Sequence, residues 1–171
     1  PQSRPHIGSV VDELCLVRSM TTSSPIHESA LMLINCGSVS QLTPSMGSWL
    51  SYGLGTENQD LPGFVTIKPP TRVGGAQNYG SAFMPAVYQG TAIGNLNDNI
   101  KDASIGNLTN KSLGSGLQRK QIDLIQSMNR NLRHEKPSDQ RIDGVIKSYE
   151  LAYRMQSSVP EMLDLSNESQ A

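Results

Sequence analysis

Four consecutive hydroxyl side chains stand just ahead of a histidine in the N-terminal part of the chain. The hydroxyls belong to Thr21, Thr22, Ser23 and Ser24, and the histidine is His27. A hydroxyl can act as a nucleophile when a base lies close to it, and a neutral imidazole can bind a metal ion or donate one hydrogen bond. We therefore take the four hydroxyls as candidate catalytic groups, and His27 as a candidate contact to a metal ion or an oxyanion.

The elements on either side of this cluster would have to position it. The alternating and β-branched residues 10–20 predict a strand of a covered sheet. Pro25 suits the first turn of a helix that Gly37 would end. Helices that follow strands begin at the carboxyl edge of a parallel sheet, where their N-termini attract anions. With Ser24 as the N-cap, His27 would be the third residue of the helix, where the helix dipole favours neutral imidazole.

The same residues also have a purely structural interpretation. Serine, threonine and histidine are common where helices begin. The hydroxyls would then only cap and turn the chain, and His27 would be an ordinary polar residue of the first helical turn. The pattern leaves both interpretations open.

Further elements follow in an order typical of the α/β class. A short helix is expected from Pro44 with Thr43 as its cap, and residues 64–67 are expected to form a buried strand. Residues 74–114 are rich in glycine, asparagine and serine, which predicts an irregular insertion anchored by residues 83–88. We expect a parallel sheet with flanking helices, whose strand-helix-strand core spans residues 1–73.

Two amphipathic stretches predict a helical hairpin over residues 115–157, followed by a tail at 158–171. Helices are expected at 117–133 and 138–156, packed through Leu124, Met128, Val145 and Tyr149. Two helix-spaced ion pairs are expected on the second helix, Asp143 with Lys147 and Glu150 with Arg154. Such a hairpin is typical of scaffold, although it could also be an independent interaction module.

Composition excludes some classes of partner. Fourteen basic residues against fifteen acidic ones give a net charge of -1, which is unlike a protein that binds the nucleic-acid backbone. The longest apolar stretch, residues 30–34, is far too short to span a membrane. Cys15 and Cys36 lie among apolar neighbours, which favours core packing over a disulfide. Neither has a CxxC partner, so a zinc site is not supported.

Several longer motifs carry a family resemblance. They are residues 44–58 (PSMGSWLSYGLGTEN), 61–65 (LPGFV), 80–85 (GSAFMP), 88–90 (YQG), 149–156 (YELAYRMQ) and 158–161 (SVPE). Together they strongly resemble a bacterial family known only as domain of unknown function 1501. The resemblance implies the alkaline-phosphatase-like superfamily, whose members include sulfatases. It implies a nucleophile at a helix N-terminus, with aspartates and histidines that hold one or two divalent metal ions.

The resemblance has gaps at the site itself. In sulfatases the nucleophile, a cysteine or serine, stands ten residues before the glycine that ends its helix. Ten residues before Gly37, this chain has His27. The sulfatase motif Cys-x-Pro-Ser-Arg is absent, so formylglycine chemistry is not supported. The acidic and Asp-His metal motifs have no counterpart here and would lie outside the chain.

The sequence thus predicts an internal fragment of a larger α/β protein with a partial alkaline-phosphatase-like sheet. The parent would hydrolyse sulfate or phosphate esters of a small molecule or glycan, with a divalent metal ion held largely by residues outside this chain. The alternative is a noncatalytic binding or structural relative that kept the fold. An exported bacterial protein is compatible with the resemblance, although any signal would lie outside the chain.

Overall fold

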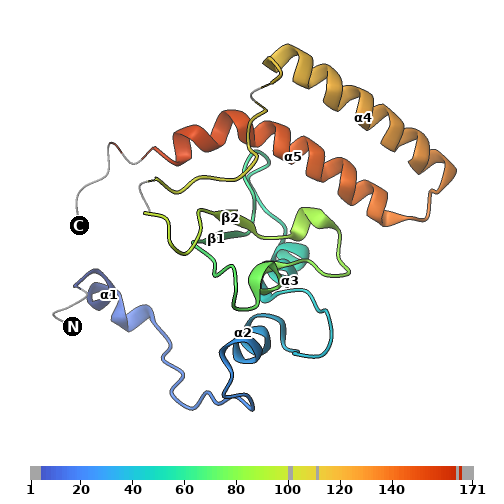
Figure 1. Ribbon diagram of the computed structural model, residues 1–171. Coiled ribbons are helices and arrows are strands. Elements are labelled where there is room, and N and C mark those ends of the chain that lie inside the picture. Colours follow the sequence, from blue (N-terminus) through green and yellow to red (C-terminus); the bar gives the residue numbers. More distant parts are fainter. Residues whose placement is uncertain (1–4, 100–101, 111, 165, 167–171) are drawn as a thin grey trace.

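A computed structural model describes residues 5–99, 102–110, 112–164 and 166. The chain combines helices with a small parallel sheet, which agrees with a mixed α and β class (Figure 1). In chain order the elements are α1 (Pro5–Ser9), η1 (Val11–Glu13), α2 (His27–Cys36), α3 (Met46–Leu54), β1 (Val65–Ile67), η2 (Gly75–Tyr79), η3 (Ala86–Tyr88), β2 (Thr91–Ile93), α4 (Ser115–Glu135) and α5 (Gln140–Met162). Within the described residues, no helix has the length and apolar composition to cross a bilayer.

The sheet joins β1 and β2 in parallel. Val65 lies opposite Thr91, and the Thr91 amide donates to the Phe64 carbonyl at 2.9 Å. Parallel strands need a long crossover, and residues 68–90 provide it with η2 and η3. The strand predicted at residues 64–67 therefore forms, but it is not buried, since Ile67 is 63% exposed. Two three-residue strands are too small to be covered on both faces. The second strand lies within the segment that we expected to be irregular.

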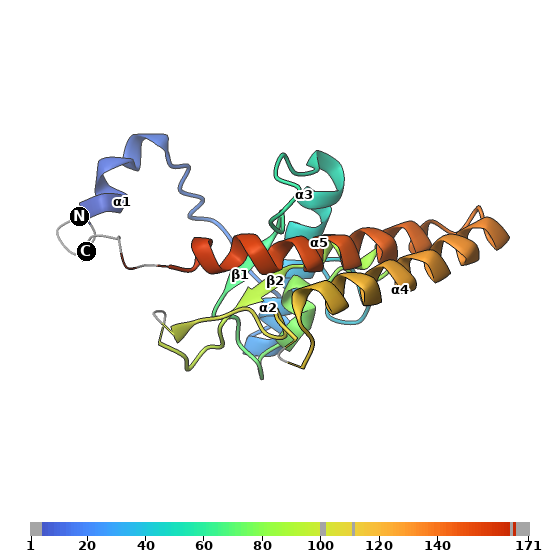
Figure 2. The ribbon, with the colours of Figure 1, turned by 90° about the horizontal axis from the view of Figure 1, so that it is seen from above.

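The prediction of a strand at residues 10–20 is wrong. Residues 11–13 form η1, and the chain that follows is extended and exposed, with Leu16 80% exposed. In both views this segment runs apart from the body of the molecule (Figures 1 and 2). An alternating pattern becomes a covered strand only beside a pairing neighbour, and the described residues offer none here. Cys15 lies on this segment and is exposed, contrary to its predicted core position, whereas Cys36 is half-buried; both thiols are free.

Helices α2 and α3 form close to their predicted positions, with different caps. α2 ends at Gly37, whose φ of 74° is the left-handed conformation expected of a helix-ending glycine. Its N-cap is Ile26, not Ser24. α3 is capped by Ser45, whose hydroxyl accepts from the Ser48 amide at 3.4 Å. Thr43, the predicted cap, donates instead to the Cys36 carbonyl at 2.7 Å.

Buried hydroxyls attach α3 to the crossover segment. The Ser48 hydroxyl and the Ser45 amide both donate to the Gly80 carbonyl, each at 3.0 Å. Both serines are buried. The Phe64 ring lies against Gly47 so closely that a β-carbon there would be 2.4 Å from the ring. These contacts fix the start of α3 against residues 79–90.

Helices α4 and α5 form the predicted hairpin, but its predicted apolar contacts are wrong. Leu124 and Met128 are each 63% exposed, and Val145 and Tyr149 are also exposed. The buried residue of α4 is Gln126, whose amide donates to the Ile146 carbonyl at 2.8 Å. α4 packs mainly on α5 and lies on the outer side of it, which leaves Leu124 and Met128 exposed (Figure 1).

The predicted ion pairs within α5 are also wrong. Asp143 pairs with Arg133 of α4 at 2.8 Å, and Arg154 pairs with Asp60 at 3.5 Å. Pairs four residues apart on one helix contribute only about 0.2–0.5 kcal/mol. Partners on neighbouring elements therefore displace them easily.

The apolar core lies where α5 meets the crossover segment. Its buried side chains are Met84, Ile93, Ile142, Met155 and Val159. α5 approaches this segment at Gly144, which is buried, and a β-carbon there would lie 2.4 Å from the β-carbon of Pro85. The absence of a side chain at this position permits the contact.

Gly144→Ala should therefore destabilise the protein, although alanine normally stabilises a helix interior. The added methyl group must push α5 away from Pro85, at a cost of about 1–3 kcal/mol for overpacking. Gly116→Ala is the matched control, because no heavy atom outside the local helix backbone and its chain neighbours lies within 4 Å of a β-carbon there. Urea unfolding should show a lower midpoint for Gly144→Ala, and an unchanged or higher one for Gly116→Ala. Equal midpoints would refute the contact.

Candidate functional site

The hydroxyl cluster predicted as catalytic lies on the exposed segment before α2. Thr21, Thr22 and Ser23 are exposed and Ser24 is half-buried. The Ser24 amide donates to the Thr22 hydroxyl at 3.3 Å, and the Ile26 amide donates to the Ser24 hydroxyl at 3.3 Å. These contacts are local turns. The catalytic role of the hydroxyls stays a prediction.

His27, the candidate metal or oxyanion contact, is the first residue of α2 and is exposed. It is not the third residue, because Ile26 rather than Ser24 caps the helix. Over the described part of the chain, no three His, Cys, Asp or Glu side chains lie close enough to hold a metal ion together. The described residues therefore do not fit a complete divalent metal site.

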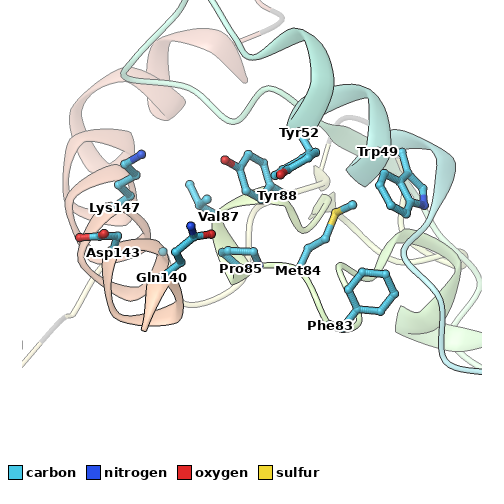
Figure 3. Close-up of a pocket in the computed structure, with 11 residues that line it drawn as sticks. Trp49, Tyr52, Phe83, Met84, Pro85, Val87, Tyr88, Gln140, Asp143 and Lys147 are labelled. Atoms are coloured by element: carbon cyan, nitrogen blue, oxygen red, sulfur yellow. The ribbon is translucent and has the colours of Figure 1, made fainter. Parts of the chain in front are cut away.

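A cleft of about 420 Å³ lies between α3, residues 83–88 and α5 (Figure 3). We call it the aromatic cleft. One wall carries four rings and the other is the polar side of α5. Its lining residues are Trp49, Tyr52, Phe83, Met84, Pro85, Val87, Tyr88, Gln140, Asp143, Gly144 and Lys147.

The four rings of the aromatic wall contact one another edge to face. Trp49 and Tyr52 are three residues apart on α3, which places them on one helix face. Their ring centroids are 6.3 Å apart at 84°, Trp49 lies 6.1 Å from Phe83, and Tyr52 lies 5.3 Å from Tyr88. Edge-to-face pairs are worth about 0.5–1.5 kcal/mol beyond area burial. The wall is thus held together by its own contacts, while Trp49 remains 49% exposed.

The opposite wall presents one uncompensated positive charge. Figure 3 shows the Lys147 ammonium on the side of α5 nearest Tyr88, whereas the Asp143 carboxylate points away from the rings. That carboxylate is paired with Arg133 at 2.8 Å. Among the described acidic residues, none forms an ion pair with Lys147. The cleft can therefore receive a planar or apolar group beside the rings and an anion beside Lys147.

A second hollow of about 390 Å³ adjoins this cleft, and we call it the polar cavity. The two share Val87, Tyr88 and Lys147. Its name refers to the hydroxyl, amide and charged side chains that stand among glycines and aliphatic residues in its remaining lining. That lining comprises Ser51, Gly55, Thr56, Asn58, Gln59, Leu61, Gly63, Ile146, Glu150, Leu151 and Arg154.

Glu150 is the acid of the polar cavity, and α4 already binds it. Arg119 donates to both of its carboxylate oxygens at 3.3 Å, and Gln126 donates at 3.1 Å. The Arg119 hydrogen bond is the main cause that lowers the pKa of Glu150. Arg119 also binds Asp123 and lies 4.8 Å from the centre of the Tyr153 ring. Glu150 thus stays ionised and neutralised by α4.

Sequence reasoning missed the aromatic cleft. The sequence predicts only a short helix from Pro44 and an anchor at residues 83–88, and neither expectation indicates a cleft. The spacing of Trp49 and Tyr52 is the one local signal that could have indicated an aromatic face. The remaining lining residues come together only through the packing of distant segments.

The family model described as "Protein of unknown function (DUF1501)" matches residues 1–171. The matched span includes both the aromatic cleft and the polar cavity. No curated protein matches the chain significantly, and no solved structure does so either.

Acid should weaken the contact between α4 and α5. Because the folded-state pKa of Glu150 lies below its ordinary value of 4.5, its ion pair contributes stability above that value. This stability is lost as the pH falls through the folded pKa. The difference in melting temperature between pH 7 and pH 3 should be smaller for Glu150→Gln than for the original chain. Glu161→Gln, an exposed acid on α5, is the control. Identical pH profiles for all three proteins would contradict the role of Glu150.

Proposed function

The chain belongs to the DUF1501 family, and from this premise we propose that it takes part in the hydrolysis of sulfate or phosphate esters. The observation that carries the proposal is the aromatic cleft, in which an aromatic wall lies opposite Lys147, a lysine without an ion pair among the described residues. Such esters combine an organic group with a compact anion. A site for them needs an apolar surface and a nearby positive charge, and the cleft provides both. The alkaline-phosphatase-like superfamily, which the resemblance to the DUF1501 family implies, supports the same class of substrate.

The described residues have separate roles in this proposal. Trp49, Tyr52 and Tyr88 bind the organic group of the ester, where their rings displace water from it. Lys147 draws in the anionic group and orients it toward α5. The ring contacts and the Gly144–Pro85 contact hold the two walls at a fixed separation. These roles are binding and orientation, and no bond-breaking step is assigned to them.

The divalent metal ion that such hydrolysis would use is proposed to be bound by ligands other than those described. His27 and the hydroxyls of residues 21–24 remain candidates to approach it, although none of them lines the aromatic cleft or the polar cavity. The rival proposal is a noncatalytic relative that uses the same cleft only to bind an ester or glycan.

Lys147→Gln should weaken the binding of a charged ester and leave that of a neutral analogue unchanged. Trp49 is the only tryptophan of the chain and lines the cleft, so quenching of its emission reports binding there. The probes are 4-nitrophenyl sulfate and the neutral 4-nitrophenyl glucoside. Loss of one exposed charge pair should weaken sulfate binding by about threefold.

Lys120→Gln is the matched control for this titration. It removes the same charge from an exposed position on α4 that lines neither hollow. It should leave the affinity for both probes unchanged. If neither probe quenches Trp49, or if both lysine variants weaken sulfate binding equally, the proposed cleft is refuted.

The 171-residue chain itself should bind these esters without hydrolysing them. Metal-assisted hydrolysis requires several ligands that converge on one ion, and the described residues bring no such group together. Release of 4-nitrophenol from the sulfate and phosphate esters, with added Mg²⁺, Mn²⁺ or Zn²⁺, is the measurement. Turnover that survives repeated purification and disappears with a chelator would contradict this expectation. The parent protein separates the rivals, because a noncatalytic relative would bind the esters and release nothing.

A further inference from the structure

We propose that residues 14–20, which we call the extended segment, pair as a third strand with the free edge of β1 in a second copy of the chain. Each copy gives its extended segment to the other, so the exchange closes as a symmetric dimer. No residue of the extended segment or of β1 lines the aromatic cleft or the polar cavity. The proposal therefore goes beyond the proposed function and does not depend on it.

The outer edge of β1 presents backbone groups that β2 does not bind. The Thr91 amide of β2 donates to the Phe64 carbonyl at 2.9 Å. Alternate residues of a strand direct their backbone groups to opposite sides, so the amides and carbonyls of Val65 and Ile67 point away from β2. Over the described part of the chain, the sheet consists of β1 and β2 alone. Such a two-stranded sheet gains stability from a further strand.

The opposite edge of the sheet is already partly covered. The Gly94 amide, which follows β2 directly, donates to the Ser104 carbonyl at 2.9 Å. Ile93 also forms an isolated antiparallel bridge with Ile105. The edge that is open to a third strand is therefore the outer edge of β1.

The extended segment has the pattern of a strand and no strand beside it among the described residues. Its backbone is extended from Leu14 onward, where φ is -99° and ψ is 133°. Leu14, Leu16 and Met20 alternate with other side chains and are 54%, 80% and 71% exposed. An unpaired strand pattern and an unpaired sheet edge in one chain are the two halves of β-strand addition.

The exposed apolar side chains of the two partners have the same spacing. Val65 and Ile67 lie on one face of β1 and are 37% and 63% exposed. Leu14 and Leu16 are likewise two residues apart on one side of the extended segment. Paired at the edge, each leucine would lie beside one of the β1 residues, and such cross-strand apolar pairs stabilise a sheet. The pairing would thus cover side chains that are exposed in the single chain.

A second copy is the proposed partner because the extended segment lies away from the sheet of its own chain. In both views it runs apart from the body of the molecule (Figures 1 and 2). Stable dimers bury about 800 Å² on each partner. The exposed area of the chain exceeds that of a compact monomer of its mass by more than this amount. The dimer can therefore form from surface that is already exposed.

Leu16→Asp should weaken the dimer. Light scattering over a dilution series of the original chain should show twice the monomer mass, falling to the monomer mass at low concentration. The variant should raise the dissociation constant by about tenfold or more, because the carboxylate would enter an apolar contact. Val39→Asp is the matched control, since Val39 is also exposed, at 54%, and lies in a loop. Melting temperatures of the dilute proteins should agree, because Leu16 is exposed in the single chain.

A disulfide between Cys15 and position 66 tests the register. Cys15 is the middle residue between the two leucines, and Thr66 is the middle residue of β1, so the two lie side by side whichever way the strands run. Neighbouring β-carbons on paired strands are about 4.5–5.5 Å apart, within reach of a disulfide after small adjustments. The background carries Cys36→Ser. One protein keeps Cys15, and a second protein of different tag length carries Cys15→Ser with Thr66→Cys.

Mild oxidation of the mixed proteins should give a heterodimer linked from Cys15 to position 66, identified by peptide mass spectrometry. Its yield should exceed that of a control by about tenfold, because pairing raises the effective concentration of the two thiols. The control partner carries Cys15→Ser with Lys120→Cys, which places an exposed thiol on α4. A third protein carries Cys15 and Thr66→Cys in one chain, and it should yield linked dimers.

Each other result would overturn the proposal. A monomer at all concentrations shows that the copies do not pair. A linked monomer from the third protein shows that the extended segment pairs with β1 of its own chain. A dimer that resists Leu16→Asp, or that gives no more heterodimer than the control, uses another surface. Binding of 4-nitrophenyl sulfate is measured separately, so its failure or success leaves this outcome unchanged.

Discussion

The close contact between Gly144 and Pro85 is the constraint on which the rest of the structure depends. A side chain at position 144 would occupy the place of the Pro85 ring, so α5 can approach the crossover segment only at a glycine. The contact brings Ile142 and Met155 into the small apolar core. It also sets the separation between the polar face of α5 and the aromatic wall. Helix interiors disfavour glycine by about 0.5–1 kcal/mol relative to alanine, and here the approach of another segment offsets that cost.

The other wall of the cleft depends on the same crossover segment. The Gly80 carbonyl receives hydrogen bonds from Ser45 and Ser48, which fix the start of α3. The Phe64 ring packs against both Gly47 and Gly90, where added β-carbons would lie 2.4 and 2.8 Å from it. Residues 79–90 therefore connect α3, β1, β2 and α5. Both walls of the aromatic cleft are positioned by one short segment that has little regular structure of its own.

Local signals in the sequence predicted the elements better than their burial. The predicted end of α2, the predicted strand at residues 64–67 and the predicted helices α4 and α5 each differ from the observed bounds by only a few residues. Burial of a side chain depends on which element packs against it, and the periodicity of its own segment does not indicate that element. Leu16, Leu124 and Met128 have the spacing of buried residues and are exposed.

The solvent-accessible area of the chain shows how much surface stays exposed. The chain of 18.5 kDa exposes 12833 Å², against about 8,200 Å² for a compact monomer of that mass. The candidate site likewise depends on contacts between distant parts of the chain. The residues that line the aromatic cleft come from three segments far apart in the sequence. The sequence therefore indicates only one local feature of it, the spacing of Trp49 and Tyr52.

The charge of the cleft follows from the docking of α4 onto α5. Helical spacing predicts that Asp143 neutralises Lys147 and that Glu150 neutralises Arg154. α4 instead provides Arg133 for Asp143 and Arg119 for Glu150. The buried amide of Gln126 then fixes the position at which the two helices meet, because a buried polar group must keep its partners. Both acids of the site thus pair with arginines of α4, and Lys147, which lines both hollows, forms no ion pair with a described acidic residue. α4 contributes no lining residue to either hollow, yet its arginines determine which charges the site presents.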